Sequence, residues 1–160
     1  MHCDQHVRKM VLEYTQMEIT ARVLLGELPD TTAYHTPRMR NHPCSVFVRS
    51  CAAGFSYVVA LRDALLDEFV YRFRDDELFE PRPHATAIFL ASLPPPDMSR
   101  LFPHRRRAKP FPLAVGTSTR YEGDPVRTYR EFYHVDKARF ATWTRRPPPD
   151  WWQGEIHGQD

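Results

Sequence analysis

The sequence has few of the signals that mark secreted, membrane-spanning or nucleotide-binding proteins. It contains only three cysteines, an odd number without paired spacing, so we expect free thiols in a reducing compartment. Its start, MHCDQHVRKM, has no apolar signal core, and no stretch approaches the length of a membrane span. It has no Gly-rich phosphate loop and no Gly-x-Ser-x-Gly motif, so nucleotide binding and serine hydrolysis have no support. We therefore expect a cytoplasmic protein without a membrane partner.

Metal ligands are also sparse. The candidates are spread along the first third of the chain, and none of their spacings matches a zinc knuckle or a His-Glu-x-x-His helix. We therefore expect no metal site and no cofactor. The residues considered are Cys3, His6, His35, His42 and Cys44.

The composition indicates one folded domain spanning residues 1–160. Apolar residues make up 42% of the chain, which favours a packed globular protein over a disordered one. A net charge of +2 excludes a histone-like polycation. Fifteen prolines predict long irregular connections, above all the basic, Pro-rich segment 93–123.

The apolar pattern is helical almost throughout, and period-two strand signals are nearly absent. We therefore predict an all-α fold: a single compact helical domain with long Pro-rich loops and an extended aromatic C-terminal tail over 145–160. Arg62 falls on the apolar line of the second helix, which is an anomaly for a core face. The predicted helices cover 4–25 (Asp4 as N-cap, Gly26 as stop), 44–73, 84–92 and the segment that follows Asp124.

The first helix carries a polar row beside its apolar stripe. His6 and Glu13 are seven residues apart and point in nearly the same direction, with Lys9 between them. The simplest interpretation is a surface i,i+4 ion pair between Lys9 and Glu13. The functional interpretation is an amine beside a carboxylate, which can form a Schiff base with a sugar or carbonyl carbon while the carboxylate moves protons.

Cationic and aromatic residues elsewhere are compatible with DNA. Arginines and lysines supply most phosphate contacts, and exposed tryptophans can stack on bases or fill the gap that a flipped base leaves. Solvated loops and a tail folded over the core are the simpler alternatives. The candidate DNA-binding residues are Arg22, Arg49, Arg105, Arg106, Arg107, Lys109, Arg145, Arg146, Trp151 and Trp152.

Three motifs carry a resemblance to a family. CDQHVRKMVLEYTQM, NHPCSVFVR and DPVRTYREFYHVDKARFATWTRRPPPDWW together resemble a family of small uncharacterised phage-encoded proteins over nearly the whole chain. More remotely, Asp4-Gln5-His6 with Glu13 seven residues later, a second long helix and a basic aromatic tail resemble the phage pyrimidine-dimer DNA glycosylases of the endonuclease V type.

That resemblance implies a helical enzyme that binds double-stranded DNA and flips a nucleotide. In that class the chain's α-amino group attacks the sugar C1′ and a glutamate assists glycosidic cleavage and β-elimination. The matching glutamate is Glu13 and the matching histidine is His6. Glycosylases of this class have further residues before the first helix, so either the native start lies upstream of Met1 or Lys9 is the nucleophile; both stay open.

We therefore expect a monomeric DNA N-glycosylase with AP-lyase activity, acting on a damaged or modified base in the host-cell cytoplasm if the protein is phage-encoded. Glu13 is the acid–base group, Lys9 or the terminal amine the nucleophile, and His6 the orienting residue. The alternatives are a non-catalytic phage DNA-binding accessory protein and an enzyme of phage DNA base modification.

Overall fold

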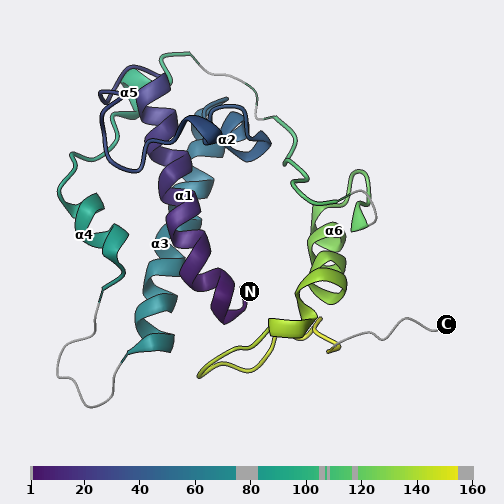
Figure 1. Cartoon of the computed structure of the whole chain (residues 1–160). Coiled ribbons are helices and arrows are strands. Elements are labelled where there is room, and N and C mark those ends of the chain that lie inside the picture. Colours follow the sequence, from purple (N-terminus) through teal and green to yellow (C-terminus); the bar gives the residue numbers. More distant parts are fainter. Residues whose placement is uncertain (1, 75–82, 105–106, 108, 117–118, 155–160) are drawn as a thin grey trace.

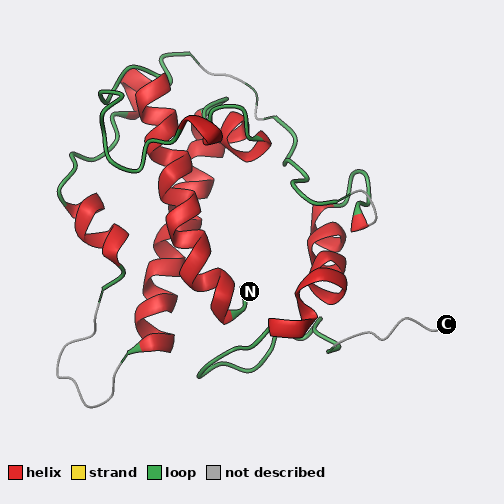
Figure 2. Ribbon diagram, viewed as in Figure 1, coloured by secondary structure: helices red, strands yellow, loops and turns green. Residues whose placement is uncertain are grey.

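The computed structural model describes residues 2–74, 83–104, 107, 109–116 and 119–154, and all the regular structure in these ranges is helical (Figures 1 and 2). The predicted all-α fold is confirmed. In these ranges no helix is both long and apolar enough to cross a bilayer. The elements are α1 (Asp4–Leu24), η1 (Pro37–Met39), α2 (Pro43–Val48), α3 (Ala52–Phe73), α4 (Ala85–Ala91), α5 (Met98–Leu101), α6 (Pro125–Phe132), the π turn η3 (Tyr133–Lys137) and the 3-10 turn η4 (Ala138–Phe140).

Helix α1 has almost the predicted length, but its cap differs. Gly26 adopts a φ of +80°, the left-handed conformation that ends the helix, and the Leu25 and Gly26 amides donate back to the last turn. Cys3, not Asp4, is the N-cap residue, so the predicted cap is wrong. The Asp4 carboxylate instead accepts hydrogen bonds from Thr144 and from the Arg72 guanidinium, which hold the C-terminal segment against this helix.

The predicted helix over 44–73 is two helices. α2 ends at Val48, and Cys51 has an extended backbone before α3 begins, with its sulfur accepting the Gly54 amide. A Cβ on Gly54 would lie 2.7 Å from the Phe47 carbonyl oxygen. Glycine is therefore required where the end of α2 closes on the start of α3, a tertiary contact that a periodicity argument does not reveal.

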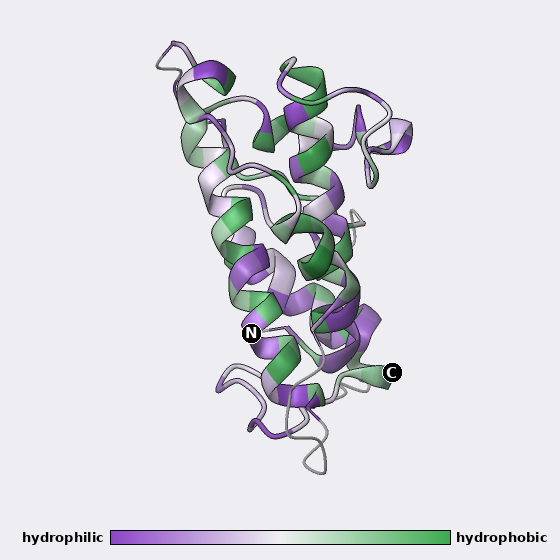
Figure 3. Cartoon of the chain, turned by 90° about the vertical axis from the view of Figure 1, so that its left-hand side faces the viewer, coloured by the Kyte–Doolittle hydropathy of each residue, from purple (hydrophilic) through white to green (hydrophobic). Residues whose placement is uncertain are grey.

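The core lies between α1 and α3, which run side by side (Figure 1). The side view in Figure 3 shows apolar and polar residues alternating along the helices, as in amphipathic helices. Arg62 lies between two apolar clusters and pairs with the buried Glu18, which also pairs with Arg22 at 3.4 Å. The anomaly noted on the core face is thus a buried ion-pair network, the arrangement that makes buried charges tolerable.

Helix α6 stands apart from this pair and faces α1 across the molecule (Figure 1). The Pro-rich segment links α5 to α6, and η3 and η4 return the chain to the start of α1. There the Asp4 amide donates to the Thr142 carbonyl oxygen at 2.8 Å. Helix α6 therefore forms a second wall that is tied to α1 at its far end.

Candidate active-site cleft

A cleft of about 630 Å³ lies between α1 and α6, with contributions from α2, α3 and the Pro-rich segment. This volume is in the range of small-molecule sites, roughly 300–1,000 Å³. Among its lining residues the single carboxylate of Glu13 is outnumbered by three basic side chains, those of Lys9, Arg130 and Lys137. Most of the remaining lining is aromatic or aliphatic. The cleft therefore favours an anionic ligand that has a flat or apolar part.

The polar row predicted on the first helix faces this cleft. His6, Lys9 and Glu13 all line it, and the Lys9 Nζ lies 3.1 Å from Glu13 Oε1. The Lys9 side chain is 64% exposed and that of Glu13 is 30% exposed. The amine is accessible from solvent, whereas the carboxylate is partly enclosed by the cleft. A lysine and a carboxylate thus stand together at a ligand-sized opening.

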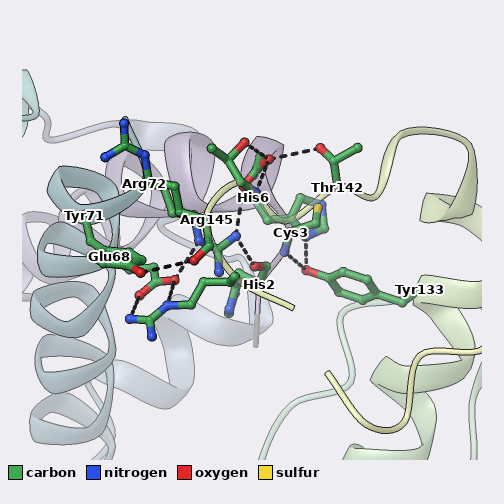
Figure 4. Close-up of polar contacts among 12 residues, drawn as sticks. His2, Cys3, His6, Glu68, Tyr71, Arg72, Tyr133, Thr142 and Arg145 are labelled. Atoms are coloured by element: carbon green, nitrogen blue, oxygen red, sulfur yellow. Dashed lines mark hydrogen bonds and ion pairs between the residues drawn. The ribbon is translucent and has the colours of Figure 1, made fainter. Parts of the chain in front are cut away.

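His6 is bound by a tyrosine from the opposite wall. Its Nδ1 lies 2.6 Å from the Tyr133 hydroxyl, which also accepts the Cys3 amide at 3.4 Å (Figure 4). Burial and then the positive charges of Lys137 and Lys9 together lower the pKa of His6 to about 4, against the opposing effect of Glu13. His6 is therefore neutral at pH 7. If the tyrosine donates to Nδ1, the proton of the imidazole is on Nε2.

Several cleft residues were missed by the sequence-based predictions. His2 lies 3.4 Å from the Tyr14 hydroxyl through Nε2, and burial, with the neighbouring His6, lowers its pKa to about 3. Tyr133 and Lys137 belong to the π turn η3, whose extra residue rotates the chain between α6 and η4. The sequence predicted only a helix after Asp124 and singled out neither residue. The π turn carries no signal in a single sequence that would have found them.

An ionic network lies beside the start of α1 (Figure 4). Arg72, which is fully buried, donates to Asp4 at 2.9 Å and to Glu68 at 2.6 Å, and Glu68 also pairs with Arg146 at 3.0 Å. Burial alone would raise the pKa of Asp4, but hydrogen bonds from Arg72 and from Thr144 outweigh it and hold that pKa below its usual value. This network fixes the segment that follows η4, and with it the second wall of the cleft.

The predicted DNA ligands differ in how far the structure buries them. Arg22 is 1% exposed and hydrogen-bonds to Glu27 and to the Pro94 carbonyl oxygen, which corrects its assignment as a phosphate ligand. Arg49 is half-buried beside Arg40, and desolvation followed by that like charge lowers its pKa. Its Nη1 has no hydrogen-bond partner among the described residues.

The remaining predicted cations lie on loops. Arg107 and Lys109 are exposed on the Pro-rich segment, whereas Arg105 and Arg106 lie outside the described residues. Arg146 is held by Glu68, and the exposed Arg145 donates to the Arg74 carbonyl oxygen. Arg107 and Lys109 are therefore accessible to a ligand from solvent.

The two C-terminal tryptophans are half-buried and pack on the second wall. Trp151 lines the cleft with its ring edge-on to Tyr133 at 5.6 Å. Trp152 is stacked on His134 at 5.1 Å and lies 5.1 Å from Trp143. Both rings already have aromatic partners within the protein.

Two observations limit the chemistry that the cleft residues can perform. Over the described ranges, no group of three or more His, Cys, Asp or Glu side chains is placed to hold a metal ion. The three cysteines are free.

No family model matches the chain, and no curated protein and no solved structure matches it. What the cleft can do therefore rests on its own residues.

Proposed function

We propose that this protein binds double-stranded DNA and cleaves the N-glycosidic bond of a damaged or modified base. One observation carries the proposal: Lys9 and Glu13 place an amine and a carboxylate 3.1 Å apart on the wall of a cationic, aromatic-lined cleft. An amine nucleophile beside a proton acceptor is the minimum equipment for amine-dependent base excision. The aromatic lining and the excess of cations suit a nucleotide that has been turned out of a duplex.

The reaction divides between the two groups. Glu13 accepts a proton from the Lys9 ammonium, and the free amine attacks C1′ of the deoxyribose. The new N–C1′ bond forms as the bond from C1′ to the base breaks, and the departing base takes the bonding electrons and the proton that Glu13 had accepted. A proton of the new secondary ammonium then passes to O4′ as the C1′–O4′ bond breaks, so the sugar ring opens and a protonated Schiff base remains. The carboxylate, which has returned its first proton, then removes a C2′ proton so that the 3′ phosphate leaves by β-elimination.

The neighbouring residues have supporting roles in this scheme. His6 is neutral and orients the sugar or the base through Nε2, because Tyr133 occupies its Nδ1. Lys137 is a second lysine of the same cleft, with its Nζ 4.4 Å from the Phe132 ring centroid. The chain's α-amino group stays an alternative nucleophile, since Met1 lies outside the described residues. Arg107 and Lys109 contact DNA phosphates beside the cleft.

A second candidate function is a non-catalytic DNA-binding accessory role. The observation that favours it is the 64% exposure of the Lys9 side chain in an ion pair with Glu13. A lysine that is solvated and held in an ion pair is a poor nucleophile. The same surface would then hold DNA without cutting it.

Borohydride trapping distinguishes the two functions. The purified protein is incubated with ultraviolet-irradiated DNA, phage-modified DNA and duplex DNA containing one abasic site, each with sodium borohydride. The glycosylase proposal expects a covalent protein–DNA band from wild type and its loss in Glu13→Gln. Lys9→Arg is the matched variant, because it keeps the positive charge next to Glu13 while removing the nucleophilic amine.

The variants also identify the amine. Loss of the band in Lys9→Arg and its persistence in Lys137→Arg make Lys9 the nucleophile, whereas the reverse pattern assigns Lys137. A band that survives both variants indicates the α-amino group. Wild-type protein that binds all three DNAs without a band is the accessory protein, and the glycosylase proposal is then abandoned.

A further inference from the structure

An aromatic cluster with open faces lines the cleft beside the Lys9–Glu13 pair. It is centred on Phe111, whose ring centroid lies 5.5 Å from Phe47, 5.7 Å from Tyr57 and 6.2 Å from Tyr129. All four rings line the cleft. Tyr57 is 49% exposed and Phe111 is 39% exposed. Large aromatic surface is therefore left in water where four separate elements converge.

The chain holds this surface in place. Phe111 stands between Pro110 and Pro112, whose rings restrict the backbone on either side. The Tyr129 hydroxyl of α6 donates to the Pro112 carbonyl oxygen at 3.2 Å and accepts the Ala114 amide at 3.2 Å. A ring fixed in this way loses little conformational entropy on binding a ligand, which is the property of a preformed site.

The charge around the cluster indicates what it binds. Lys109 is exposed two residues before Phe111, and the cleft carries Arg130 and Lys137 against the single carboxylate of Glu13. Aromatic faces interleaved with cations are the general solution for binding unpaired nucleotides, with the ring stacking on the base and the cation on the phosphate. A purely apolar partner would gain nothing from these charges.

The tryptophan pair does not offer the same surface. Trp151 and Trp152 are half-buried and already pack against Tyr133, His134 and Trp143. Less of either tryptophan is therefore open to a base than of Tyr57 or Phe111. This observation argues against the tryptophans as the stacking residues.

We propose that Phe111 and Tyr57 form the platform on which an extrahelical base of bound DNA stacks, and that Trp151 and Trp152 support the cleft wall instead. The inference rests on the proposed DNA-binding function and adds the residues that receive the flipped base. In this arrangement the Pro-rich segment presents one stacking ring, that of Phe111, and one phosphate contact, that of Lys109.

Photo-crosslinking tests the platform directly. The probe is a short duplex with a single 5-iododeoxyuridine opposite an abasic analogue, irradiated with long-wavelength ultraviolet light and mapped by peptide mass spectrometry. We expect the adduct on Phe111 or Tyr57. Phe111→Leu keeps an apolar side chain but removes the ring, and should weaken binding of the probe by about tenfold or more, the loss of one stacked base.

Two further variants serve as controls. Phe111→Tyr keeps a stacking ring and should restore wild-type binding. Val135→Ala removes another exposed apolar side chain, one outside the cleft lining, and should change nothing. Circular dichroism establishes that each variant is folded, and if Phe111→Leu is not, the position of the wild-type adduct decides.

Several results overturn the platform: adducts confined to Trp151 or Trp152, no adduct from protein bound to the probe, no binding of the probe, or a folded Phe111→Leu with wild-type affinity. Borohydride trapping separates this failure from failure of the proposed function. Trapping without an adduct on Phe111 or Tyr57 rejects the platform alone. An adduct there without trapping on any DNA rejects the glycosylase chemistry alone.

Discussion

Replacing Asp4 by asparagine should loosen the attachment between the C-terminal segment and the first helix. The Asp4 carboxylate accepts hydrogen bonds from the Arg72 guanidinium at 2.9 Å, from the Thr144 amide at 2.9 Å and from the Thr144 hydroxyl at 2.8 Å. Asparagine has nearly the same shape and keeps one acceptor oxygen, but it brings no charge. The Arg72 side chain, 0% exposed, would then have Glu68 as its only acidic partner among the ion pairs described here.

The loss of stability in Asp4→Asn depends on which partners Arg72 retains. Stripping a buried charge of every partner costs about 3–5 kcal/mol. Glu68 stays 2.6 Å from Arg72, so the loss is nearer that of one charge-assisted hydrogen bond, about 1.5–3 kcal/mol. For a chain of this length that corresponds to a fall in Tm of roughly 3–12 °C.

The pH dependence supplies a second, independent readout. The pKa of Asp4 is lowered in the folded protein, so its stabilisation is complete above the unfolded pKa of about 3.9 and is lost as pH falls through the folded value. Urea unfolding should therefore show a constant difference between wild type and Asp4→Asn near neutral pH. Below about pH 4 the two curves should converge, because the wild-type carboxyl becomes neutral as well.

Asp150→Asn is the matched control, since Asp150 is exposed on the same C-terminal segment. It should leave the free energy of unfolding within about 0.5 kcal/mol of wild type. Equal stability of Asp4→Asn and Asp150→Asn at pH 7, or a difference that widens on acidification, would refute this reasoning.

Three further predictions address packing, protonation and DNA contact. Gly54→Ala should destabilise the protein in urea, because a Cβ 2.7 Å from the Phe47 carbonyl oxygen costs about 1–3 kcal/mol of overpacking against at most about 1 kcal/mol of helix propensity; wild-type stability would contradict the close approach. His6 has a folded pKa of about 4 against 6.5, so the unfolded state binds more protons between these values and stability falls as pH is lowered through them. His6→Gln should reduce that fall without abolishing it, because His2 contributes in the same sense, and parallel pH–stability curves would count against a buried neutral imidazole. Lys109→Ala should lower DNA affinity and reduce the slope of log K against log salt by about 1 while leaving Tm unchanged; an unaltered slope would remove Lys109 from the phosphate contacts.

Local rules predicted most of the helices correctly. The apolar stripe of the first helix and the left-handed Gly26 follow from side-chain spacing and backbone sterics, and both appear in the structure. The same rules joined α2 and α3, since apolar spacing continues across the break at Arg49–Cys51. That break depends on the approach of Gly54 to Phe47, a contact between two helices, and no single-helix pattern contains it.

The wall of the candidate site that α1 provides was predictable from that helix alone. His6, Lys9 and Glu13 share a direction because residues three, four and seven apart do so on any α-helix, and the structure places all three in the cleft. The opposite wall was not predictable in this way. Tyr133 and Lys137 reach the cleft through a π turn and a chain return that brings residues more than 100 positions apart into contact.

The sequence by itself determined the all-α class, the extent of the first helix and the polar row along it, because each depends on interactions between residues a few positions apart. Only the tertiary structure decided that Arg22 is a buried structural cation, that the tryptophans are packed into a wall and that Phe111 stands open beside Tyr57. Those outcomes depend on which surfaces meet when distant segments pack. Burial and pairing are properties of that packing, and the same arginine or aromatic residue is a ligand or a core residue according to what lies against it.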